Sequence, residues 1–182
     1  MKRRVYLPAL KTQIDPLTFC KGRLLTARLL RLRFLGLLVA GIWIVLDQIS
    51  KTWAQSNLMG HPRFLFGHVG FELIYNSGFA FGIASGSSAI ITIFGLIVSA
   101  GLIFALWRTS RRTIALGIGL VLGGALGNVV DRLFRHNGGA VIDFIHSGFW
   151  PTFNLADMGV VVGLIVIMVG SRQRQASSSS NR

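Results

Sequence analysis

The sequence predicts an all-α membrane protein with four transmembrane helices and a small extracytoplasmic β-cradle. First, 52% of the 182 residues are hydrophobic and only 14% are charged, which is unusual for a soluble domain. Second, four apolar segments are each long enough to cross about 30 Å of hydrocarbon as a helix. Third, most of the 19 Lys and Arg residues, against 6 Asp and Glu, lie outside these segments. This pattern favours contact with membrane lipid and argues against nucleic acid as a partner.

The chain is expected to divide into a basic cytoplasmic arm (residues 1–33), a four-helix membrane domain (34–170) and a disordered cytoplasmic tail (171–182). The serine run at 177–180 is typical of a disordered tail. Helices are expected in the membrane because every backbone polar group in hydrocarbon needs an internal partner. The four expected spans are 34–53, 89–107, 113–130 and 153–170.

The distribution of basic residues predicts the orientation. The arm holds nine Lys and Arg residues, the link between the second and third spans holds three, and the tail holds three. The opposite side has Arg63, Arg132 and Arg135. Both termini are therefore expected in the cytoplasm. On the outer side, alternating apolar residues in 54–88 predict a strand pair lying on the membrane, and 131–152 is expected to be a short excursion.

Acidic residues are concentrated on the predicted outer side. Asp15 lies in the arm, whereas the other five map to the outer ends of spans or to the outer segments. Carboxylates near hydrocarbon are costly, so they are usually paired, hydrated or functional. The five are Asp47, Glu72, Asp131, Asp143 and Asp157.

Asp47 and Lys51 share one helix face at the end of the first span, and an intrahelical ion pair is favoured over a catalytic role. Ser50 and Lys51 could in principle form a hydrolytic dyad, but adjacent residues point to different sides of a helix. In the third span, glycines recur every four residues from 119 to 127. This stripe predicts close packing of a neighbouring helix.

Polar residues continue the face that carries this stripe. Asn128, Asp131 and Arg132 are spaced three and four residues apart, and we expect them to point into the bundle.

Two further acids have different environments. Asn154 and Asp157 have the spacing of a capping box, which alone could explain Asp157. The same helix end would also favour an ionised carboxylate. Asp143 lies among apolar residues without an evident basic partner, which predicts a raised pKa. One neutral and one ionised carboxyl are what an aspartic peptidase requires.

Five short strings occur in order along the chain and map to one membrane face: DQISK (47–51), NSGFAFG (76–82), GGALGNVVDR (123–132), VIDF (141–144) and FNLAD (153–157). Together they resemble the lipoprotein signal peptidases, or signal peptidase II. The resemblance implies an intramembrane aspartic endopeptidase of the bacterial inner membrane, with its active site at the outer face. Such an enzyme removes signal peptides from diacylglyceryl-modified prolipoproteins, cutting before the lipidated cysteine. We expect it to be a monomer without a cofactor or metal.

The resemblance also implies roles for individual residues. Asp143 and Asp157 would form the catalytic pair. The family often has another acid just after its DF string, where this chain has Ile145 and His146, so a third carboxylate is not expected there. The residues expected to bind substrate or support the site are Asn76, Asn128, Asp131, Arg132, Asn154, Asp47 and Lys51.

Two other functional classes fit the sequence less well. A small ion-coupled transporter could use outer-facing aspartates, but the sequence shows no related halves and no acid in the middle of a span. A metal-dependent hydrolase would need ligands with a recognisable spacing, and no HExxH-type motif is present. The residues that it could gather are Asp131, His136, Asp143, His146 and Asp157.

Overall fold

The computed structural model describes residues 16–78 and 88–179. In these ranges the elements are α1 (Pro16–Leu58), β1 (Arg63–Phe66), β2 (Val69–Asn76), α2 (Ser88–Arg108), α3 (Arg112–Phe134), β3 (Val141–His146) and α4 (Leu155–Ser179). All four helices contain a segment long and apolar enough to cross a membrane. The sides of the helices that face away from the bundle expose large apolar side chains such as Ile90 and Phe104, as lipid-facing helices do. The predicted four-span, mainly helical fold is confirmed.

The helices are longer than the apolar windows suggested. α1 begins at Pro16, within the expected arm, and ends at Leu58 rather than at residue 53. α3 continues to Phe134, and α4 continues to Ser179, within the expected tail. Hydropathy falls where charges begin, but Arg, Gln and Ala continue a helix readily, and 171–179 has no glycine or proline to end it. The described residues thus show no break at 33 or 170; residues 1–15 and 180–182 lie outside them.

α3 is the central helix and packs against the other three. In its most apolar part 56% of the residues are buried, compared with 17–22% in the other helices. A Cβ on Gly119 would lie 2.5 Å from the Gly36 oxygen, and one on Gly123 would lie 2.9 Å from the Ala40 oxygen. The glycine stripe therefore lets α1 approach closely, as the sequence predicted.

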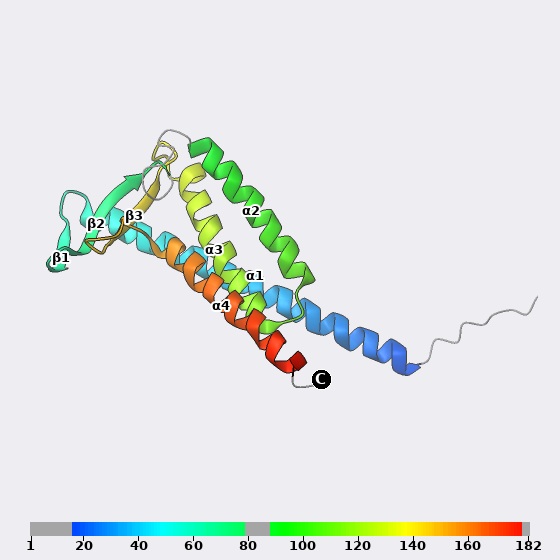
Figure 1. The fold of residues 1–182 in the computed structure, drawn as a ribbon. Helices are drawn as coiled ribbons and strands as arrows, with labels where there is room; N and C mark the ends of the chain where they lie inside the picture. Colours follow the sequence, from blue (N-terminus) through cyan, green and yellow to red (C-terminus); the bar gives the residue numbers. More distant parts are fainter. Residues whose placement is uncertain (1–15, 79–87, 180–182) are drawn as a thin grey trace, which may run out of the picture.

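The three strands form one antiparallel sheet in the order β1-β2-β3, which lies at one end of the helices (Figure 1). β1 and β2 are the strand pair expected within 54–88. β3 was not predicted, because its apolar residues do not alternate and its partner strand is distant in sequence. In the register of β2 and β3, Ile74 lies opposite Asp143 and Asn76 lies opposite Val141.

A hydrophobic cluster fixes this sheet on the end of α1. Ala54 and Leu58 of α1 are buried together with Ile142 and Phe144 of β3. The Trp53 ring makes an edge-to-face contact with Phe144, at 6.4 Å between ring centroids. Because β3 is held against α1 on both sides of Asp143, the position of that carboxyl group is set by core packing.

Candidate active site

Asp143 lies on β3 and is almost fully buried, with 3% of its surface exposed. Its two carboxylate oxygens accept hydrogen bonds from Asn76 Nδ2 at 3.0 Å and Asn154 Nδ2 at 2.7 Å. Burial raises the pKa of Asp143 to about 6; the hydrogen bond from Asn76 opposes the shift and the nearby charge of Asp157 adds to it. The direction agrees with the expectation from its apolar sequence neighbours.

Asp157 lies in the first turn of α4, where the expected capping box is present. Asn154 Oδ1 accepts a hydrogen bond from the Asp157 N–H at 3.0 Å, and Asp157 Oδ2 accepts one from the Asn154 N–H at 3.2 Å. The other carboxylate oxygen, Oδ1, accepts a hydrogen bond from Asn128 Nδ2 at 2.9 Å. Asp157 therefore caps its own helix through one oxygen and contacts α3 through the other.

Asn154 links the two acids. It is fully buried, and its Nδ2 donates to both Asp143 Oδ1 and Asn128 Oδ1, the latter at 3.1 Å. Its backbone N–H donates to Asp157. One residue thus contacts both carboxylates, which brings β3 and the start of α4 together around them.

A fully buried ion network lies behind the two acids. Lys51 Nζ lies 2.9 Å from Asp47 Oδ2 and 3.0 Å from Asp131 Oδ2, and it donates to Asn128 Oδ1 at 2.9 Å. The expected pair within α1 is present, but Lys51 also joins α1 to α3, which its spacing did not predict. Asp131 Oδ2 accepts a hydrogen bond from the Ile142 N–H at 3.0 Å, so the network also holds β3.

The first turn of α4 is held from α1 as well. Asp47 Oδ1 accepts a hydrogen bond from the Ala156 N–H at 2.8 Å. Trp43 Nε1 donates to the Leu155 oxygen at 3.1 Å. These two contacts lie immediately before Asp157 and limit movement of its backbone. Trp43 was not singled out from the sequence, where nothing distinguishes it from other apolar residues of the span.

Two more supporting residues were missed. Arg135 forms an ion pair with Asp131 at 3.1 Å and donates to the Gln48 backbone oxygen at 2.9 Å. Gln48 Nε2 in turn donates to Asp131 Oδ1 at 2.9 Å. From the sequence, Arg135 was assigned only to the charges of the outer face, although its four-residue spacing from Asp131 indicates a pair on one helix face.

A cavity of about 430 Å³ opens onto the two acids. Its polar end is lined by Asn76, Asn128, Arg132, Asp143, Asn154 and Asp157, and its apolar walls include Ile91 and Val98 of α2 and Val160 and Val161 of α4. Asp47, Lys51 and Asp131 do not line it. The predicted site residues therefore divide into six at the cavity and three in the network behind.

Arg132 has donors available at this cavity. Its Nη1 and Nη2 make long hydrogen bonds of 3.4 Å to the backbone oxygens of Asn128 and Gly78, respectively. Its Nε is buried without a hydrogen-bond partner among the described residues. Because their present bonds are long, Nη1 and Nη2 of Arg132 could donate to a molecule bound in the cavity.

The residues considered as metal ligands from the sequence do not gather. Over residues 16–78 and 88–179, no three His, Cys, Asp or Glu side chains come together in an arrangement that could hold a metal ion. His146 Nδ1 instead lies 3.1 Å from Thr152 Oγ1 and 3.9 Å from Glu72 Oε2.

Comparisons with known proteins converge on one family. The family model described as signal peptidase (SPase) II matches residues 39–172. A lipoprotein signal peptidase of Rhodococcus jostii (strain RHA1) is 43% identical over 143 residues, covering 75% of this chain and 72% of that protein. One of Syntrophomonas wolfei is 40% identical over 129 residues, covering 69% and 85%.

Solved structures are also similar. A bacterial membrane enzyme structure determined in meso at 2.3 Å resolution matches with a TM-score of 0.68 and 25% identity, covering 78% of this chain and 90% of that one. A second such structure, at 1.9 Å resolution, matches with a TM-score of 0.63 and 27% identity, covering 74% and 90%.

Proposed function

Because the chain belongs to the signal peptidase II family, we propose that it is an aspartic endopeptidase in which Asp143 and Asp157 are the catalytic pair. Because it belongs to this family, the chain is a peptidase of bacterial membranes that removes signal peptides from lipoproteins. Our proposal adds the catalytic type and the bond that is cut, which is the peptide bond before a diacylglyceryl-modified cysteine. The observation that carries it is the contact of one buried residue, Asn154, with both carboxylates at the wall of the cavity.

The two carboxyls differ in a way that suits general acid–base catalysis. Asp143 is buried and its pKa is raised to about 6, so it holds a proton more readily than an ordinary aspartate. Asp157 lies in the first turn of α4, beside the positive end of the helix dipole. In this scheme Asp157 removes a proton from water, and the resulting hydroxide attacks the carbonyl carbon. Asp143 donates its proton to the carbonyl oxygen, which gives a tetrahedral diol. Asp157 then passes the proton that it took from water to the cysteine nitrogen, Asp143 takes a proton back from one diol hydroxyl, and the C–N bond breaks to give a carboxylic acid and an amine.

The cavity fits a substrate that is partly apolar. Its walls on α2 and α4 can contact a signal helix or acyl chains, while Asn76, Asn128 and Arg132 can donate hydrogen bonds to the peptide near the acids. Two acyl chains anchor a protein firmly, because each buried CH₂ contributes about 0.8 kcal/mol. We therefore propose that the diacylglyceryl group holds the scissile bond at the depth of the acids.

Topology follows from the basic residues. With fifteen Lys and Arg on one side and three on the other, leaving out Lys51 within the first span, we propose that both termini are cytoplasmic and that the acids lie at the outer face. Tags at either terminus should then resist protease in intact spheroplasts. Their digestion from outside would contradict this orientation.

We also propose that the enzyme works as a monomer, with membrane lipid and precursor proteins as partners and no nucleic acid.

The catalytic pair is tested with Asp143→Asn and Asp157→Asn, using a diacylglyceryl precursor and purified enzyme in detergent. Each variant should fold and lose cleavage, because an amide is similar in shape but cannot act as acid or base. Glu72→Gln is the matched control, since Glu72 is a partly exposed carboxylate of the same sheet that does not line the cavity and should retain activity. Substantial cleavage by either aspartate variant would refute the pair.

Substrate recognition is tested separately. The precursor without its diacylglyceryl group should be cut far more slowly, and Arg132→Ala should weaken substrate use without changing the acids. Equal rates on the two precursors would mean that lipid recognition is wrong even if the aspartic chemistry is right.

A further inference from the structure

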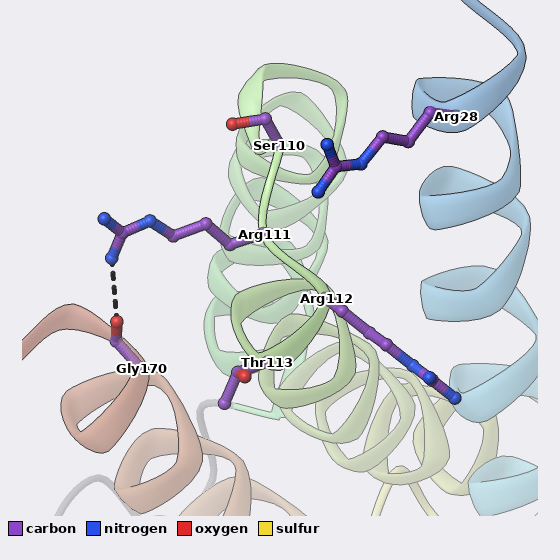
Figure 2. A pocket seen from close by; sticks show the side chains of 6 residues that line it. All are labelled: Arg28, Ser110, Arg111, Arg112, Thr113 and Gly170. Carbon is purple, nitrogen blue, oxygen red and sulfur yellow. Dashed lines mark hydrogen bonds between the residues drawn. The ribbon is translucent and has the colours of Figure 1, made fainter. Parts of the chain in front are cut away.

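A second cavity lies at the end of the bundle opposite the sheet, where α1, the link between α2 and α3, and α4 meet. Its volume is about 310 Å³, and its lining residues are Arg28, Ser110, Arg111, Arg112, Thr113 and Gly170. Figure 2 shows Arg28 extending from α1 toward the link that carries Ser110. Arg111 extends toward α4, where its Nη1 donates to the Gly170 oxygen at 2.8 Å. Three arginines therefore line one cavity.

No carboxylate balances this charge within the described parts of the chain. Five of the six acidic residues belong to the active-site end, and Asp15 lies outside the described residues. The ion pairs among the described residues are formed by three of those five acids, Asp47, Glu72 and Asp131, and neither Arg28 nor Arg112 takes part in one. Both arginines are exposed. The cavity is thus strongly positive and lacks an anion from the described protein.

The backbone adds to this positive potential. α3 begins at Arg112, and its N-cap residue Arg111 makes no side-chain capping hydrogen bond. The first N–H groups of a helix have no partner within the helix, and they carry the positive end of its dipole. At this cavity those groups lie beside Ser110 and Thr113, so donors from the backbone and from hydroxyl groups supplement the guanidinium groups.

The cavity lies at the depth of lipid headgroups. Arg33 stacks over the Trp107 ring, at 5.6 Å from its centroid, and donates to the Trp107 oxygen at 3.2 Å. Tryptophan concentrates at the boundary between hydrocarbon and headgroups. Arg28 precedes Arg33 by five residues, or about 7.5 Å along a helix. That distance matches the headgroup layer, which is roughly 5–8 Å thick on each side of the hydrocarbon core.

We propose that this cavity binds the phosphate-bearing headgroup of an anionic phospholipid. Guanidinium groups form strong, paired hydrogen bonds with phosphate, and the uncapped start of α3 suits the same anion. The volume fits a headgroup, while the acyl chains would follow the lipid-facing surface of the helices. Such a lipid would connect the ends of α1, α3 and α4. This site lies at the opposite end of the bundle from the acids, and lipid binding there does not depend on catalysis.

The test measures lipid binding by native mass spectrometry of purified full-length protein titrated with phosphatidylglycerol or phosphatidylcholine. Wild type should bind phosphatidylglycerol in clear preference. In the double variant Arg28→Gln/Arg112→Gln, affinity should fall about fivefold for each arginine, or roughly 25-fold in total. The control is Arg31→Gln/Arg172→Gln, which removes two exposed arginines that do not line the cavity; it should bind nearly as wild type does.

Equal binding of the two lipids by wild type would overturn the proposal, and so would equal losses in the two double variants. Glycerol phosphate serves as a probe without acyl chains. If it bound as tightly as the lipid, the occupant would be a free phosphate ester and the lipid assignment would be wrong. Should the double variant fail to fold, the wild-type comparison of the two lipids and glycerol phosphate still decides the question.

Discussion

Replacing Lys51 with methionine is predicted to destabilise the fold strongly. The Lys51 ammonium is fully buried and contacts Asp47 Oδ2, Asp131 Oδ2 and Asn128 Oδ1 at 2.9–3.0 Å. Methionine can fill similar space with its flexible, apolar side chain but carries no charge. The variant would leave two buried carboxylates, with Arg135 still in contact with one of them.

The magnitude follows from the burial of this network. Removing one partner of a buried ion pair costs about 3–5 kcal/mol. For a chain of this size, 1 kcal/mol shifts the melting temperature by about 2–4 °C, so Lys51→Met should lower Tm by roughly 6–20 °C. Activity should also fall, because the Asn128 amide that Lys51 contacts is the same group that donates to Asp157.

Thermal unfolding in detergent, followed by tryptophan fluorescence, measures the effect. The double variant Lys51→Met/Asp47→Asn restores the charge balance and should be more stable than Lys51→Met alone. Arg63→Met removes an exposed basic side chain from β1 and should change Tm by only about 1–2 °C. A Lys51→Met protein that melts within about 3 °C of wild type, or a double variant no more stable than the single one, would refute the reasoning.

Three further predictions concern catalysis. If the proton on Asp143 is required, kcat/KM should fall about tenfold per pH unit above 6; a profile flat from pH 5 to about 8 would contradict this. The folded state binds that proton more tightly than the unfolded chain, so the stability that Asp143 contributes is full below its ordinary pKa of 3.8 and is lost as pH rises through about 6. EDTA should leave cleavage unchanged, whereas loss with EDTA and rescue by zinc would support metal-assisted hydrolysis. Gly124→Ala would push a Cβ against the Ala156 oxygen, displacing the turn that carries Asp157 and lowering activity about 10- to 100-fold. The control is Gly101→Ala, because a Cβ at that position meets no atom within 4 Å. Equal initial rates of cleavage by the two variants would contradict the packing argument.

Features set by local spacing could be predicted from the sequence. The spans follow from apolar segment length, and the Asp47–Lys51 pair follows from its four-residue spacing. The capping box of Asn154 and Asp157 was likewise evident from residues three apart. In each case the interacting groups belong to one helix, so the geometry of the helix alone determines whether they meet.

Contacts between distant segments could not be predicted in this way. The pairing of Lys51 with Asp131 depends on how α1 and α3 pack against each other, which the glycine stripe permits without fixing the register. β3 could not be predicted either, because its six residues lack alternation. Asn76, which donates a hydrogen bond to Asp143 of this strand, is 67 positions away in the sequence. The resemblance to a family named the residues of the site, but it did not describe the sheet that holds Asp143.

The buried ion network has a consequence for biogenesis. α1 carries Asp47 and Lys51 one turn apart, and Asp131 near the end of α3 lies one turn before Arg135, the residue that follows the helix, so each of these two buried acids has a basic partner on its own segment. A segment whose charges cancel locally enters the bilayer at lower cost than one with a lone charge. When the helices later associate, Lys51 can form an ion pair with Asp131 while it keeps the one with Asp47. The same four side chains can therefore first ease insertion of two separate helices and then select the correct partner for each.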